Sequence, residues 1–194
     1  MRAEDGPRTV NELIARAKAN PGKLNYGAGI ITTRLAGHLF NREAGLDVQY
    51  IPFNGSAPTV QGLLNGAVDY IVDGVASSLP LINSGKLRPL AKLNSRPLPQ
   101  LPDVPPLSVA AGMPLLDDMS SWIAFVAPAG TPRAIIDKLN AEIMRIYADP
   151  AIAEKLDKAG INAASSTPED FDAFFRREAV RWDKAFKESG IKLD

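Results

Sequence analysis

The sequence of 194 residues contains no cysteine and a single histidine, His38. Without cysteine there is no thiol nucleophile, no disulfide and no thiolate ligand for a metal. One imidazole leaves little scope for acid–base catalysis or for a histidine metal site. We therefore expect no enzymatic activity, no metal and no cofactor, and we interpret His38 as an ordinary helix residue.

An excess of charge of either sign is also missing, because 22 Lys and Arg are balanced by 22 Asp and Glu. Nucleic-acid-binding surfaces carry clustered, unbalanced basic charge, so no nucleic-acid partner is expected. No run approaches the roughly 20 apolar residues that cross a bilayer. The first six residues have no apolar signal region.

Strand-like and helix-like segments alternate in the first half of the chain. The expected strands are 23–26, 47–52, 68–73 and 90–93, and the expected helices are 10–19, 32–43, 57–65 and 77–83. Thr9 is the expected cap of the first helix, and Gly45 is expected to end the second. Such βα repeats favour a parallel sheet with helical crossovers, so the predicted fold class is α/β.

The second half has different features. The proline-rich stretch from Ser95 to Pro114 predicts a surface excursion. An apolar strand is expected at 122–127, followed by a helix capped by Thr131 and a short helix at 151–158. A long helix is expected after Thr167, ending before Gly190. The expected buried side chains of the helices at either end of this region are Ile135, Ile136, Leu139, Ile143 and Ile146, and then Phe171, Phe174, Phe175, Trp182, Ala185 and Phe186.

One glycine-containing loop is the strongest candidate for a binding site. Gly27, Ala28 and Gly29 lead from a predicted strand into a helix that begins near Thr32 and Thr33. Free N–H groups at such a helix start receive a carboxylate or a phosphate, and the two hydroxyls add donors. The alternative is a plain turn in which Thr32 only caps the helix. The fit to a dinucleotide-binding fingerprint is poor, because Thr32 replaces the third glycine.

Two further groups are expected at the same edge of a parallel sheet. Asn54, Gly55 and Ser56 follow the second predicted strand, and an ordinary turn is the alternative for them. Asp73 ends the third predicted strand, and Ser77 begins the next helix. The Asp73 carboxylate is a candidate acceptor for a ligand hydroxyl or ammonium, with a local turn at the following glycine as the alternative.

Several motifs occur in the order found in one family. They are ELIARAKANPGKL (12–24), LAGHLF (35–40), PFNG (52–55), SGKLR (84–88), LPDVP (101–105), APAGTP (127–132), KLN (138–140), TPEDF (167–171), RW (181–182) and GIKLD (190–194). On these motifs the chain resembles the periplasmic solute-binding receptors of tripartite tricarboxylate transporters, the Bug receptors. The resemblance covers most of the chain.

The resemblance implies a fold like that of type II periplasmic binding proteins, with two α/β lobes around a small carboxylate. Residues 8–120 would form one complete lobe, and 121–194 the carboxy-terminal part of the other. The amino-terminal half of that incomplete lobe, the first lobe of the family, is absent from this sequence. We therefore expect either an excised fragment or the product of a shortened gene, without one wall of the ligand cleft. A periplasmic location and membrane transporter subunits as partners are likewise implied.

Three functional hypotheses follow. The first is a binding protein that delivers a small carboxylate to a membrane transporter. The alternatives are a ligand-sensing regulatory domain and a nucleotide-binding enzyme fragment, although no DNA-reading helix-turn-helix and no nucleophile or metalloprotease motif is found. The missing half-lobe would expose apolar surface, so we also expect a homo-oligomer.

Overall fold

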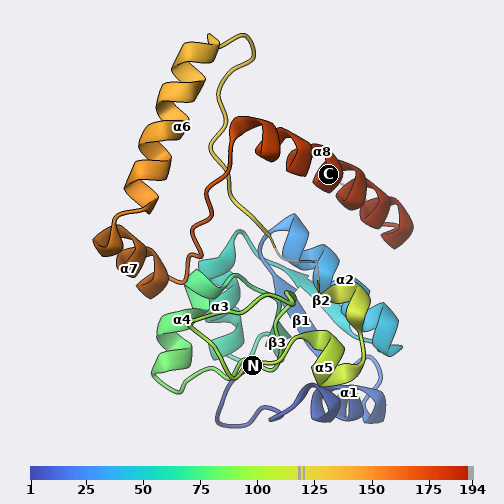
Figure 1. The fold of residues 1–194 in the computed structure, drawn as a ribbon. Helices are drawn as coiled ribbons and strands as arrows, with labels where there is room; N and C mark the ends of the chain where they lie inside the picture. The colour runs from blue at the N-terminus through green and yellow to red at the C-terminus, as the bar shows by residue number, and fades with distance from the viewer. Residues whose placement is uncertain (118, 120, 192–194) are drawn as a thin grey trace. The chain divides into compact units, whose positions relative to one another are not determined.

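The computed structural model describes residues 1–117, 119 and 121–191, and the chain divides into two compact units, Met1–Ser121 and Trp122–Asp194. Figure 1 shows their elements. The first unit contains α1 (Val10–Ala19), β1 (Asn25–Ala28), α2 (Ile31–Ala44), β2 (Gln49–Pro52), α3 (Ser56–Leu64), β3 (Tyr70–Ile71), α4 (Val75–Asn83), α5 (Leu107–Ala111) and the 3₁₀ turn η1 (Pro114–Leu116). The second unit contains α6 (Arg133–Tyr147), α7 (Pro150–Lys158) and α8 (Pro168–Ser189).

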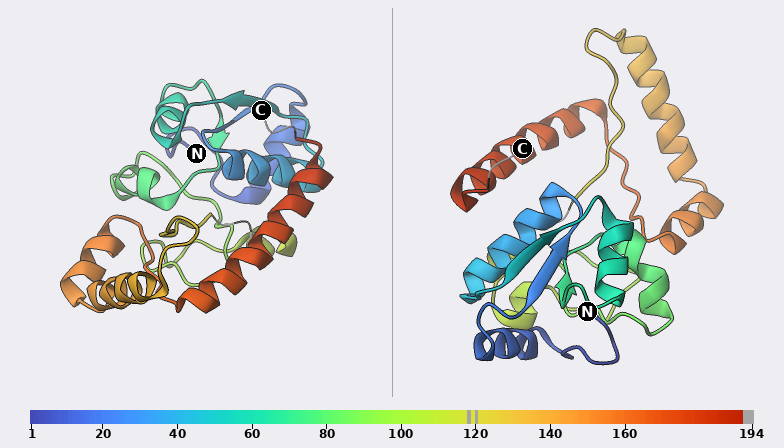
Figure 2. Two further views of the ribbon diagram at one scale, coloured as in Figure 1. Left: turned by 90° about the horizontal axis from the view of Figure 1, so that it is seen from above. Right: turned by 180° about the vertical axis from the view of Figure 1, so that it is seen from behind.

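A parallel three-stranded sheet with the order β2-β1-β3 organises the first unit. Helices α2 and α3 cover opposite faces of β1, because neighbouring side chains of a strand point to opposite faces. The Tyr26 ring packs against Gly37 of α2, whereas Gly27 lies against the Phe53 ring, which also contacts Gly62 of α3. Figure 2 shows the strands with these helices beside them. The predicted α/β class with a parallel sheet is confirmed.

One part of the core of this unit lies between α3 and the sheet. Val60, Leu63, Val68 and Leu87 form one buried cluster, with Phe53 packed against it. Fully burying a Leu or Val side chain stabilises the fold by about 1.5 to 3 kcal/mol. The glycine positions opposite the Phe53 ring let helix and strand approach closely, so this packing fixes where β2 and α3 meet.

Helix boundaries that depend on neighbouring residues agree with the predictions. Helix α1 spans Val10–Ala19, and the Thr9 side chain accepts from the Glu12 N–H at its start. Helix α2 ends at Gly45, which adopts the left-handed conformation at φ 63°. Thr167 caps α8 by accepting from the Asp170 N–H, and Gly190 ends it.

Two predictions for the segment after α4 are wrong. Residues 90–93 do not form a strand; they contribute a single parallel bridge between Lys92 and Pro106. The proline-rich stretch is not wholly a surface excursion, because it contains α5 and leads into η1, which bury Leu107 and Leu116. Helix α5 packs against α1. The apolar residues between the prolines therefore complete the core at one end of the unit.

The second unit contains no strand among its described residues, so the expected strand at 122–127 is wrong. This segment is irregular, and Ile123, Phe125 and Val126 are 98%, 73% and 81% exposed. A strand needs a hydrogen-bonded neighbour, and no described segment supplies one.

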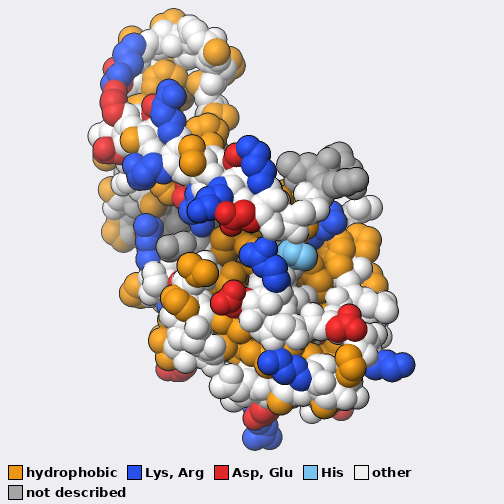
Figure 3. Space-filling model, turned by 90° about the vertical axis from the view of Figure 1, so that its right-hand side faces the viewer, with side chains coloured by type: hydrophobic (Ala, Val, Ile, Leu, Met, Phe, Trp, Pro, Cys, Tyr) orange, Lys and Arg blue, Asp and Glu red, His pale blue; other side chains and the backbone are white. Residues whose placement is uncertain are grey.

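The apolar stripes of this unit are present, but they are not buried. No residue of α6, α7 or α8 is buried, contrary to the expected burial along α6 and α8. The Trp122 ring packs edge-on against Phe171, Phe174 and Phe175, which gives the aromatic residues partial cover only. Thr131 is not the cap of α6, since its hydroxyl donates to the Pro128 carbonyl and Pro132 occupies the cap position. Exposed hydrophobic side chains are also visible on the face drawn in Figure 3.

Two further observations concern the described residues alone. None of their helices is both long enough and apolar enough to cross a membrane. No three of their His, Asp or Glu side chains are grouped as a metal site requires.

Candidate functional site

Three helices begin at one edge of the sheet. Helix α2 follows the carboxyl end of β1, α3 follows that of β2, and α4 follows that of β3. Because the strands are parallel, these three helix N-termini lie at the same edge. The first N–H groups of any helix have no partner inside the helix, so donors accumulate there.

The starts of α2 and α3 also lack neutralising groups, whereas the Asp73 carboxylate lies directly before α4 and accepts hydrogen bonds from two of its serines. None of α2, α3 and α4 has a side-chain cap or an acidic residue in its first turn. Helices α1 and α8, in contrast, carry both. The starts of α2 and α3 therefore keep the partial positive charge of their helix dipoles, which favours an anion between them at this edge.

The first candidate loop is short and largely occupied by internal contacts. Gly27 and Ala28 lie in β1 and are buried, and only Gly29 and the next residue separate β1 from α2. The Thr33 hydroxyl donates to the Ile30 carbonyl at 2.9 Å. The Thr32 hydroxyl lies 3.0 Å from that of Ser121 and shares a hydrogen bond with it. Thr32 thus presents the more accessible hydroxyl of the two threonines.

The first and second loops are in direct contact. The Gly55 N–H donates to the Gly29 carbonyl at 3.0 Å. A methyl group at Gly29 would lie only 2.1 Å from the Gly55 oxygen. A methyl group at Gly27 would meet the Phe53 ring at 2.9 Å. Both glycines are therefore explained by close packing within the chain.

The second loop retains donors of its own. Gly55 has φ 98°, a conformation that favours glycine, and no atom lies within 4 Å of where its Cβ would be. Since its N–H is bonded to Gly29, the donors that remain at this loop are the Ser56 N–H and hydroxyl and the Asn54 side-chain amide.

Asp73 is bonded to the helix that follows it. One carboxylate oxygen accepts from the Ser77 hydroxyl at 2.5 Å and from the Ser78 hydroxyl at 3.0 Å. Ser77 also lies 2.9 Å from the Gly74 carbonyl. Because Val72 donates to Gly27 at 3.4 Å, β3 delivers Asp73 to the same edge as the first loop. Among the described residues, the hydrogen bonds of Asp73 and Ser77 stay within the start of α4 and do not reach the two glycine loops.

Sequence reasoning missed three residues beside this edge. The Arg34 guanidinium lies 4.9 Å from the centre of the Tyr50 ring, and the Tyr50 hydroxyl donates to the Ala28 carbonyl at 3.3 Å. Ser121 reaches Thr32 from a distant part of the chain. The alternation of β2 places Tyr50 on the face covered by α2, which is a usable signal, but nothing in the sequence connects Ser121 with Thr32.

Tyr26 of β1 and Tyr70 of β3 stay protonated donors at neutral pH. Burial raises the pKa of Tyr26 to about 12. Burial also raises the pKa of Tyr70, although the hydrogen bond from the Tyr70 hydroxyl to Asn41 acts in the opposite direction. Tyr26 stacks on Tyr70 and lies beside Tyr50. These three rings lie side by side on the face of the sheet that α2 covers.

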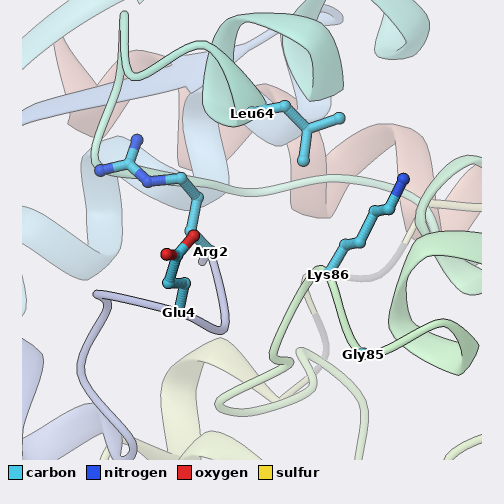
Figure 4. Close-up of a pocket in the computed structure, with 5 residues that line it drawn as sticks. All are labelled: Arg2, Glu4, Leu64, Gly85 and Lys86. Carbon is cyan, nitrogen blue, oxygen red and sulfur yellow. The ribbon is translucent and has the colours of Figure 1, made fainter.

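A separate cavity of about 360 Å³ lies elsewhere on the first unit (Figure 4). Its lining residues are Arg2, Glu4, Leu64, Gly85 and Lys86. The Arg2 guanidinium already donates to both carboxylate oxygens of Asp5 and to the Leu63 carbonyl. None of the predicted site residues lines this cavity. The Arg2 guanidinium, the group there best suited to bind an anion, already donates to Asp5 and Leu63.

Comparison with known proteins gives a consistent set of matches. A family model described as "Tripartite tricarboxylate transporter family receptor" matches residues 1–191. A protein from the tcbD–tcbE intergenic region of a Pseudomonas species is 37% identical over 183 residues, which are 93% of this chain and 54% of that protein. Protein BugT of Bordetella pertussis is 33% identical over 187 residues, covering 95% of this chain and 57% of BugT.

Solved structures give the same picture. An R. palustris protein determined with adipate has a TM-score of 0.87 and 28% identity, covering 98% of this chain and 64% of that protein. The periplasmic binding protein BugD has a TM-score of 0.84 and 26% identity, covering 100% and 65%. MatC from Rhodopseudomonas palustris, with bound malate, has a TM-score of 0.76 and 26% identity, covering 95% and 64%. The chain spans little more than half the length of the two curated relatives.

Proposed function

Since the chain belongs to the tripartite tricarboxylate transporter family of receptors, we propose that it acts as a solute-binding protein for a small carboxylate and not as an enzyme. The observation that carries this proposal is the sheet edge where α2 and α3 begin side by side without side-chain caps or first-turn acids. Such an edge provides fixed amide donors for an anion, and the Asp73 carboxylate beside it is already hydrogen-bonded to the Ser77 and Ser78 hydroxyls. Capture and release therefore suit it better than catalysis.

The proposed ligand is a dicarboxylate. Two structural neighbours were determined with adipate and with malate, which supports this class. One carboxylate would accept from the first turn of α2, the Thr32 hydroxyl and the Ser56 donors, and Asp73 would accept from a ligand hydroxyl. The full proposed set is Gly27, Ala28, Gly29, Thr32, Thr33, Asn54, Gly55, Ser56, Asp73 and Ser77. Gly27 and Gly29 would shape the loops that carry the donors.

The arrangement of lobes remains part of the proposal. Residues 8–120 would be the complete lobe of the receptor, and 121–194 the carboxy-terminal part of the other lobe. Each charge-assisted hydrogen bond is worth about 1.5 to 3 kcal/mol, against ordering costs of several kcal/mol. Two or three such bonds in a half-open cleft correspond to binding at about millimolar concentration.

Location and partners follow from the family in the same way. Structural neighbours are described as periplasmic proteins, which supports a periplasmic location for this chain. We propose that the loaded receptor docks on membrane subunits of a transporter.

Self-association is a further part of the proposal. Exposed apolar side chains at 123–126 and along α6 leave surface that a second copy would cover. Light scattering at micromolar concentration should give a mass above that of the 20.8 kDa chain. A stable monomer would contradict it.

Titration calorimetry tests the binding proposal. Succinate should bind, whereas succinamide, which has the same length but no charge, should not. The double variant Thr32→Val, Ser56→Ala should weaken succinate binding about a hundredfold, because each lost hydroxyl bond to a charged group costs about 1.5 kcal/mol, which is about tenfold in Kd. Equal heats from succinate and succinamide would contradict a carboxylate site.

A further inference from the structure

Thr59 lies directly below the second loop, in the first turn of α3, and is fully buried. Its hydroxyl donates to the Gly55 carbonyl at 2.8 Å. The Gly55 N–H in turn donates to the Gly29 carbonyl at 3.0 Å. These three residues form one hydrogen-bonded chain from α3 through the second loop to the first.

Space constrains the same three residues. A methyl group at Gly29 would lie 2.1 Å from the Gly55 oxygen and 2.6 Å from Thr59 Oγ1. Gly55 has φ 98° and ψ 173°, so its two peptide planes take one particular orientation. The contact between the loops is therefore closely fitted, and its geometry depends on where the Gly55 carbonyl points.

We propose that Thr59 is a positioning residue of the carboxylate site. Its hydroxyl holds the Gly55 peptide against Gly29 and thereby sets the α3 N-terminus relative to that of α2. Donors from two loops bind one ligand well only when their relative placement is already fixed. This inference rests on the proposed function, because an anion that bridges both loops is what makes their alignment matter.

A purely local role is the competing explanation. Threonine in a helix often donates to the carbonyl four residues earlier, with no consequence for function. The burial of Thr59 and its closeness to Gly29 distinguish this site from such a bond at a solvent-exposed position. Thr131 provides a control for a local threonine bond away from the site, because its hydroxyl donates at 2.8 Å to the Pro128 carbonyl, three residues earlier, in the other unit.

Three variants and two measurements test the proposal. Thr59→Val keeps the side-chain volume and removes the hydroxyl, Thr59→Ser restores a hydroxyl, and Thr131→Val removes the control bond. The amide exchange of Gly55 is followed by NMR, and the Kd for succinate by calorimetry. We expect Thr59→Val to speed Gly55 exchange about tenfold and to raise the Kd about three- to tenfold. Thr59→Ser should recover both values, and Thr131→Val should change neither.

The outcomes separate this inference from the proposed function. Unchanged Gly55 exchange in Thr59→Val, or faster exchange with an unchanged Kd, overturns the positioning role. If the wild-type chain binds no succinate, the proposed function fails. The amide exchange of Gly55 alone then decides whether Thr59 holds the Gly55 peptide against Gly29. Thr59→Ala provides a second hydroxyl-free variant if Thr59→Val does not fold.

Discussion

Three glycines at the sheet edge are glycine for different physical reasons. Gly29 has no space for a side chain, because the Gly55 backbone occupies the position of its Cβ. Gly55 has space but holds a positive φ of 98°. Gly74 has open space and an ordinary φ of −71°, so neither constraint applies to it.

Alanine substitutions should separate these reasons. Gly29→Ala should lower the free energy of unfolding by about 2 to 3 kcal/mol, because backbone atoms must move. Gly55→Ala should cost about 1 to 2 kcal/mol through backbone strain. Gly74→Ala, the control, should change stability by less than about 1 kcal/mol. Urea denaturation measures all three, and a Gly29→Ala variant as stable as Gly74→Ala would contradict the close packing of the loops.

The sequence shows these glycines but not their individual roles. A glycine beside a predicted helix start suggests room for a ligand, which is the interpretation that the local pattern supports for Gly27 and Gly29. The atoms that fill that room belong to Phe53 and Gly55, which follow the next strand. Long-range contacts of this kind are not encoded in local spacing.

Glu178 in α8 joins two tryptophans to a single carboxylate. Its Oε2 accepts from Trp122 Nε1 at 3.2 Å and from Trp182 Nε1 at 3.1 Å, and Arg181 donates to both of its oxygens. The Glu178 side chain is 14% exposed. The hydrogen bond from Arg181 holds its pKa below the ordinary value of 4.5, with the tryptophan bonds adding to the effect.

This lowered pKa predicts a pH dependence. A carboxyl whose pKa is lower in the folded state stabilises that state above its unfolded pKa. The stabilisation is lost as the pH falls through the folded pKa, below about 4.5. Since Trp122 and Trp182 are the two tryptophans of the chain, intrinsic fluorescence should change in that acid range.

Glu178→Gln should produce the same fluorescence change already at pH 7, because the charge that holds both indole N–H groups is removed. The expected cost is about 1.5 kcal/mol of local stability. Glu154→Gln is the control, since Glu154 forms an exposed ion pair with Lys158 far from either tryptophan in the sequence. Identical fluorescence of the wild type and Glu178→Gln at pH 7 would show that the hydrogen bonds from the two tryptophans to Glu178 do not determine the fluorescence.

At the scale of elements, helices could be predicted better than strands. The ends of α1, α2 and α8 depend on adjacent residues such as Thr9, Gly45 and Thr167, which local sequence reveals. The expected strands at 90–93 and 122–127 depend on partners far away in the chain. An apolar segment without such a partner stays unpaired, however strand-like its composition.

Hydrogen exchange should report this difference between elements. Backbone amides of 123–127 should exchange with little protection in dilute solution, whereas those of α2, with eight buried residues, should exchange slowly. If copies associate through the exposed segment, its exchange should slow as protein concentration rises. Equal protection of 123–127 and α2 in dilute solution would show that the segment is already paired.

At the scale of the whole molecule, the order of alternating strands and helices is enough to predict the parallel sheet and the edge at which α2, α3 and α4 begin. Burial of side chains in the second unit could not be predicted. An amphipathic stripe shows which face of a helix is apolar, but it does not show whether another segment packs against that face. The stripe of α6, with Ile135 and Leu139 about half exposed, is the clearest case. Family membership and the uncapped starts of α2 and α3 support the proposal of a carboxylate site at this edge.

Amide chemical-shift mapping with succinate tests this central claim most directly. The account predicts that shifts cluster at the starts of α2 and α3, at Gly29, Thr32, Thr33 and Ser56, with smaller changes near Asp73. Succinamide at the same concentration should leave these amides unchanged. Shifts that cluster instead around the cavity lined by Arg2 and Lys86, or along Ser95–Pro114, would contradict the assignment of the site.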